Sequence, residues 1–229
     1  MKSKILIIAS TAALLASCGA QEISFESFKN AGQEILNVIT SDDFKAPTKL
    51  TVNISITDDD QKGTIKFIAD DDNNNLYVYE SVEEKNEDPI VYEVWSYAEG
   101  TNYIIAAAVS EKGKTSKYYY TSPRPYNAEN SISSYLELEE NILTSLAEAE
   151  IEELYDEGGR ATFKSKGKGS IICEAKGKNG EYGYLEFSNN LIVANNYKNE
   201  DGEESMTFKW GEANFKKPNL KDFEKLDRE

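Results

Sequence analysis

Residues 50–57 have the sequence LTVNISIT, in which apolar and polar side chains alternate strictly. Successive side chains of a β-strand point to opposite faces, so this alternation predicts a strand with one apolar face. The acidic stretch 58–63 favours a turn, and the apolar positions of residues 65–69 continue the pattern on a second strand. The side chains expected on the shared apolar face include Leu50, Val52, Ile54, Ile56, Ile65 and Phe67. Such a face either lines a cavity for an apolar ligand or is plain core beneath a packed helix.

The same alternation continues through most of the chain. Before a break at Pro123 and Pro125 it predicts four further strands, near residues 76–79, 90–97, 102–109 and 117–121. After the central helical segment it predicts five more, near residues 161–165, 170–176, 182–187, 191–197 and 206–215. Short polar turns separate these strands, which is typical of antiparallel meanders with one apolar and one wetted face. The sequence therefore predicts about eleven strands.

Two segments have helical spacing instead. Ser24 is placed to cap a helix over about residues 24–40, whose apolar side chains recur at three- and four-residue steps. A second helical pattern runs from Asn127 to about Leu154, as one helix or as two with a kink. Eight glutamates lie between Glu137 and Glu157, and we interpret them mostly as the solvated side of this helix. Both helices have wide apolar stripes that need a sheet to cover.

Composition excludes several classes of function. The chain has 229 residues with 41 acidic and 25 basic side chains, and such an acidic surface repels the phosphates of nucleic acids. It contains no histidine, which excludes Ser-His-Asp and Cys-His catalysis and removes the usual zinc and copper ligands. No pair of carboxylates lies in a recognisable catalytic context. We therefore expect a non-catalytic protein without a metal or a cofactor.

The N-terminus has the parts of a secretory signal. Lys2 and Lys4 precede an apolar run from Ile5 to Leu15 that is too short to span a membrane. The following Leu15-Ala16-Ser17-Cys18 resembles the lipobox of bacterial lipoproteins. This resemblance implies cleavage between Ser17 and Cys18, a diacylglycerol on the Cys18 sulfur, and attachment to the extracytoplasmic face of the cell membrane.

Cleavage at Cys18 divides the chain into three parts. Residues 1–17 would be the signal peptide, residues 18–23 the lipidated N-terminus with a short tether, and residues 24–229 a single domain. Removal of residues 1–17 takes away two lysines and no acid, which leaves 23 basic against 41 acidic side chains and a formal charge of −18. Cys173 then has no partner for an intramolecular disulfide, and it shares strand parity with apolar neighbours. We predict that it is a buried, inert thiol.

The predicted order of helix, six strands, helix and five strands resembles the unclosed barrel of the lipoprotein-carrier group, the LolA/LolB-like and mycobacterial LppX/LprG-like proteins. The resemblance concerns topology over about residues 24–220. It implies an α+β fold in which a long curved antiparallel sheet forms a half-barrel, with an N-terminal and a central helix on its concave face. It also implies an apolar cavity for a lipid. The alternative is an envelope lipoprotein or surface antigen that binds a protein partner and has no ligand cavity.

Three further groups of residues have a functional and a structural interpretation. The aromatic side chains offer stacking surfaces for a sugar or an acyl chain, although strands are enriched in them anyway: Tyr92, Trp95, Tyr97, Tyr103 and Tyr118 to Tyr120. The acidic clusters at 58–60, 70–72 and 199–201 contain oxygen ligands but lack the spacing of a calcium loop, which favours turns. Lys166-Gly167-Lys168-Gly169 lacks the full phosphate-loop spacing, so we predict a hairpin.

Overall fold

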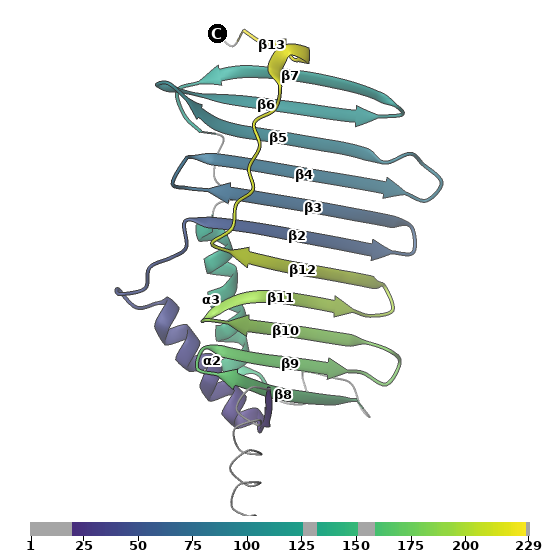
Figure 1. The fold of residues 1–229 in the computed structure, drawn as a ribbon. Coiled ribbons are helices and arrows are strands. Elements are labelled where there is room, and N and C mark those ends of the chain that lie inside the picture. Colours follow the sequence, from purple (N-terminus) through teal and green to yellow (C-terminus); the bar gives the residue numbers. More distant parts are fainter. Residues whose placement is uncertain (1–19, 126–131, 151–158, 228–229) are drawn as a thin grey trace, which may run out of the picture.

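The computed structural model describes residues 20–125, 132–150 and 159–227. These residues form an α+β fold in which two helices accompany one large unclosed sheet (Figure 1). The predicted fold class is confirmed at this level. The predicted signal peptide, the lipobox with Cys18, and residues 127–131 and 151–154 of the predicted second helix lie outside the described residues.

The sheet has thirteen strands instead of about eleven. The first meander consists of β2 (Lys49–Asp58), β3 (Gln61–Asp70), β4 (Asn75–Glu84), β5 (Ile90–Glu99), β6 (Asn102–Glu111) and β7 (Lys114–Ser122). The second consists of β8 (Arg160–Gly167), β9 (Ser170–Lys176), β10 (Tyr182–Ser188), β11 (Leu191–Lys198) and β12 (Gly202–Trp210). The two additional strands are β1 (Gln21–Ile23) and β13 (Glu224–Lys225). They were not predicted because two or three residues are too few to show alternation.

The two meanders join into a single sheet because β12 pairs with β2, from Gly202 opposite Asp58 to Trp210 opposite Leu50. The strand order is β1-β8-β9-β10-β11-β12-β2-β3-β4-β5-β6-β7-β13. All neighbours are antiparallel except β13, which runs parallel to β7. β1 and β13 lie at opposite ends of this order, so the sheet is not closed.

The prediction for the last strand was wrong at both ends, since β12 begins at Gly202 and ends at Trp210. Gly211 has a positive φ of 78° and its N–H bonds to the Lys49 carbonyl, which turns the chain out of the sheet. The following C-terminal segment, residues 211–223, crosses the sheet toward β7 (Figure 1). Its apolar side chains pack against Tyr97, Ile104 and Ala106 of β5 and β6.

The helices are α2 (Phe25–Ile39) and α3 (Ile132–Glu148). The first agrees with its prediction, and the Ser24 hydroxyl accepts the N–H of Ser27 as an N-cap at 3.1 Å. Both helices contribute buried side chains to the main core, among them Phe28 of α2 and Leu143 of α3. Neither described helix is long and apolar enough to cross a membrane.

The two cores lie on opposite faces of the sheet. The register places Phe67 opposite Val78 and Val78 opposite Val94, and this face is the one that α2 and α3 cover. We call it the helix face. The neighbouring positions Trp95 and Ala106 are also opposite one another, and they point to the other face, under residues 211–223. We call this the tail face.

Candidate binding face

All six residues predicted to line a cavity lie on the helix face. Val52 pairs with Phe67 and Ile54 pairs with Ile65, which fixes their common side. Leu50, Val52 and Phe67 are completely buried beneath the helices and are core residues. Ile54 and Ile65 are half-buried, and Ile56 is 41% exposed. The apolar face therefore leads from a packed core toward solvent along a single hairpin.

The aromatic contacts of α3 tie β12 and β3 into this packed core, against which Leu76 and Val78 of β4 also pack. The ring of Tyr135 lies 5.1 Å from that of Phe67 and 6.1 Å from that of Phe208, between centroids. Tyr135 thus reaches from β12 to β3. In Figure 1 both helices lie beside the part of the sheet between β8 and β2, and neither extends over β4 to β7.

An apolar row continues across the sheet from this core. Cross-strand pairing aligns seven side chains in order: Phe208, Val52, Phe67, Val78, Val94, Ala107 and Tyr118. The first three are buried and the last four are half-buried. We call Val78, Val94, Ala107 and Tyr118, together with the 42% exposed Tyr92 beside them, the open apolar face. On the same face Ser96 of β5 and Ile105 of β6 are buried, so the exposed part of this surface lies toward Tyr92 and Val94. There the sheet presents a surface on which an apolar molecule can lie.

The predicted aromatic surface is divided between the two faces. Tyr92 and Tyr118 belong to the open apolar face, whereas Trp95 and Tyr97 lie on the tail face. Trp95 contacts the ring of Phe223 at 6.0 Å and Tyr97 contacts that of Phe215 at 6.1 Å. These two side chains therefore stack on the chain's own C-terminal segment, and this side of the sheet is occupied at β5 and β6.

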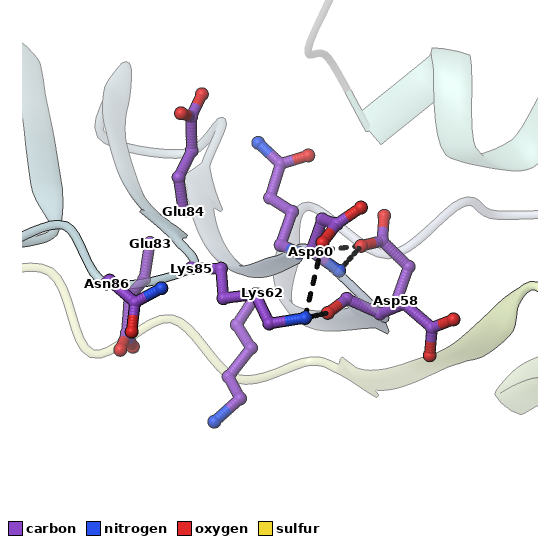
Figure 2. A pocket seen from close by; sticks show the side chains of 9 residues that line it. Asp58, Asp60, Lys62, Glu83, Glu84, Lys85 and Asn86 are labelled. Atoms are coloured by element: carbon purple, nitrogen blue, oxygen red, sulfur yellow. Dashed lines mark hydrogen bonds and ion pairs between the residues drawn. The ribbon is translucent and has the colours of Figure 1, made fainter.

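The acidic hairpin at 58–60 is stabilised by turn chemistry (Figure 2). The Asp58 carboxylate accepts the N–H groups of Asp60 at 2.9 Å and Gln61 at 2.6 Å. The ammonium group of Lys85 lies 3.5 Å from the Asp60 carboxylate. The positive charge beside the Asp60 carboxylate is therefore supplied by a lysine side chain. No group of three or more candidate ligands among the described residues is arranged to hold a metal ion.

Several other predictions are confirmed. The Asn199 side chain accepts the N–H groups of Asp201 and Gly202 at 3.0 Å, which makes this cluster a turn as well. Lys168 and Gly169 lie in the tight turn between β8 and β9, so the glycine-rich stretch is a hairpin. Cys173 is buried in the main core, and burial raises the pKa of its thiol to about 11.

The most unusual titratable group is Glu139 of α3, which is completely buried and was wrongly interpreted as part of the solvated side. One carboxyl oxygen accepts the N–H of Ile192 in β11 at 2.8 Å, and the other has no hydrogen-bond partner. The carbonyl of Ile192 accepts the indole N–H of Trp210 at 2.6 Å. Burial raises the pKa of Glu139 to about 8, although the hydrogen bond from Ile192 opposes this shift.

Glu139 closes a gap in the sheet ladder. Regular pairing between β11 and β12 ends at Ala194 opposite Thr207. Two residues before Ala194, both backbone groups of Ile192 bond to side chains, the carboxyl of Glu139 and the indole of Trp210. A neutral, protonated carboxyl satisfies the Ile192 N–H without placing a charge in the core. We therefore assign Glu139 to docking of α3 on the sheet.

No protein-family model matches the chain, and no curated protein is significantly similar to it in sequence. The function must therefore be inferred from the chain's own residues.

Proposed function

We propose that the protein is a membrane-anchored bacterial lipoprotein that binds an apolar ligand or a lipid without catalysing a reaction. The observation that carries this proposal is the apolar row, which continues from the core at Phe67 onto Val78, Val94 and Ala107, past the helices. Folding normally removes such side chains from water. A bound acyl chain would cover the part that α2 and α3 leave open.

The shape of the sheet is part of the proposal. A half-barrel that curves toward its helix face would place the open apolar face on the wall of a groove, beside the packed helices. This would be the lipid-carrier arrangement that the element order resembles. The observed single sheet, which is unclosed among the described residues and has both helices packed on one face, supports this shape. Ile54 and Ile65, half-buried at the margin of the core, would then line the groove together with Val78 and Val94.

The proposed anchor would hold the domain very close to the membrane. β1 begins at Gln21, so only Gly19 and Ala20 separate it from Cys18. Three steps of extended chain span at most about 11 Å. The tether is therefore shorter than the stretch 18–23 that the sequence predicted. A ligand that is itself a membrane lipid would need to travel only a short way to reach the domain.

The alternative is a structural or protein-binding envelope lipoprotein. Ile56, Tyr92 and Tyr197 are all exposed by more than 40% on the helix face. Tyrosine is frequent at protein interfaces because it combines an apolar ring with a polar hydroxyl. In this case a partner protein would cover the face, and no lipid would be bound.

Mass spectrometry of the chain purified from membranes in mild detergent tests both parts of the proposal. Under denaturing conditions we expect a chain that begins at Cys18 and carries a covalent diacylglycerol. Under native conditions we expect an additional, noncovalent mass in the range of a lipid. An unmodified Cys18 would contradict the anchor. Identical native and denatured masses would argue against a bound lipid and favour the alternative.

A further inference from the structure

One short segment reverses the charge of this acidic protein. Residues 160–178 contain six basic side chains and only one acid, Glu174. The basic residues are Arg160, Lys164, Lys166, Lys168, Lys176 and Lys178. This segment has a formal charge of +5, whereas the whole chain has −16, so the remaining residues sum to −21. A local excess of this size indicates a surface that meets negative charge.

The basic segment lies next to the sheet edge formed by β1, which adjoins the proposed anchor. It comprises β8, the turn after it, β9 and the start of the next loop. β8 pairs with β1, in which Ile23 lies opposite Phe163 and Gln21 opposite Ser165. Since β1 follows Cys18 after two residues, these basic side chains lie along the strands nearest the lipid. Measured along the sheet, β13 at the opposite end lies roughly 53 Å from β8, at about 4.8 Å per strand.

Nearby acids neutralise only part of this charge. Lys166 forms an ion pair with Glu186 at 2.7 Å, and Lys176 forms one with Glu174 at 2.9 Å. Glu22 of β1 lies opposite Lys164. Glu181 lies at the turn that contains Lys178, where its carboxylate accepts the N–H of Asn179 at 2.8 Å. Four acids against six basic groups still leave a local excess of positive charge.

Three of the basic side chains act together on the carboxyl group of Glu174. Lys176 holds the pKa of the Glu174 carboxyl below its ordinary value through a hydrogen bond, and the charges of Lys164 and Arg160 lower it further. Arg160 lies directly opposite Lys176 in the β8–β9 pair. Lys168 and Lys178 extend the basic surface to the two ends of these strands. The positive charge therefore follows the full length of the two strands beside the sheet edge.

We propose that this basic edge, formed by Arg160, Lys164, Lys168 and Lys178 with their paired neighbours, docks on the anionic headgroups of the membrane in which Cys18 is anchored. The inference rests on the proposed lipid anchor. Each basic side chain near an anionic bilayer adds to the attraction between the protein and the membrane. A lipid chain combined with a basic surface holds a protein more firmly than either alone. The strongly acidic remainder is repelled by the same headgroups, so the sheet stands on this edge and points β7 away from the membrane.

Chemical labelling of lysine amines tests this orientation. The full chain purified from membranes is reconstituted in vesicles of phosphatidylcholine, or of phosphatidylcholine with phosphatidylglycerol. Labelled sites are then quantified by mass spectrometry. We expect labelling of Lys164, Lys168 and Lys178 to fall at least about threefold on the anionic vesicles, because headgroups cover them. Lys62 and Lys114, on β3 and β7, serve as exposed controls and should not change. High salt should restore the lost labelling, since it screens the contact.

Three outcomes are distinguishable. Protection of the basic edge on anionic vesicles alone supports the proposal. Equal labelling of Lys164, Lys168 and Lys178 on both kinds of vesicle, with the protein bound to each, overturns it while leaving the anchor intact. Failure of the protein to float with either vesicle shows instead that Cys18 is not lipidated, which overturns the anchor and the orientation together. A further variant has Arg160, Lys164, Lys168 and Lys178 changed to glutamine. It should float normally, and labelling of its Lys166 and Lys176 should be the same on both kinds of vesicle.

Discussion

The natural chain is expected to become less stable as pH rises from about 5 to 8, and Glu139→Gln is expected to abolish this dependence on pH. The pKa of Glu139 is about 8 in the folded protein, against an ordinary value of 4.5. Between these values, unfolding releases a proton that the folded state retains. Stability therefore decreases as pH rises through this window, and it levels off above the folded pKa.

The expected magnitude is large. A single group changes the free energy of unfolding by about 1.4 kcal/mol per pH unit in such a window, or about 4 kcal/mol from pH 5 to pH 8. Folding lowers the pKa of other acids, such as Glu174 and Glu186. These acids change stability only below this range, because within it they are ionised in both the folded and the unfolded state. Glutamine preserves the acceptor for the Ile192 N–H but cannot ionise.

Urea unfolding of the natural chain and of Glu139→Gln at a series of pH values measures this difference. Glu140→Gln is the matched control, because Glu140 is the next residue of α3 and is exposed. Its curve should follow that of the natural chain. If Glu139→Gln also kept the same dependence on pH, Glu139 would not be the buried acid that links α3 to β11.

Phe67→Ala is expected to cost about 3–5 kcal/mol of stability, a large part of the 5–15 kcal/mol that is usual for a folded domain. Phe67 is 1% exposed and its ring lies 5.1 Å from that of Tyr135. Its removal would leave a cavity where α3 meets the sheet, between Val52 and Val78. Denaturant unfolding followed by circular dichroism checks this value.

The control for this substitution is Ile56→Ala. Ile56 lies on the same face of the sheet, two residues after Ile54 in β2. Ile56 is 41% exposed, so its truncation should cost less than about 1 kcal/mol. In the described packing, Phe67 of β3 lies in the core and the end of β2 lies outside it. Equal losses of stability for the two variants would contradict this packing.

The strands could be predicted from the sequence because each of them is long enough to show its own alternation. β9 coincides with its predicted range, and both meanders have the predicted numbers of strands. Local pattern gives no information on which strands pair over long distances, so the junction of β12 with β2 was not predicted. The departure of the chain at Gly211 was missed because apolar residues such as Phe215 continue after it, and these serve the tail face instead.

The site was only partly predictable for a similar reason. Alternation correctly places Ile54 and Ile65 on one face, but it cannot show where α3 ends and the open apolar face begins. Glu139 did carry a sequence signal. It lies seven residues after Ile132 and four before Leu143, within the apolar stripe of the helix instead of opposite to it. The abundance of glutamate in this helix obscured that spacing.

Titration of the full chain with cis-parinaric acid, a fluorescent fatty acid, tests the proposed binding face most directly. The natural chain should show saturable binding, and Val94→Asp should bind at least about tenfold more weakly, because it places a charge on the open apolar face. Val91→Asp is the matched control, since Val91 is also half-buried in β5 but faces the other side. It should bind like the natural chain. Absence of saturable binding, or equal affinities for Val94→Asp and the natural chain, would contradict the account.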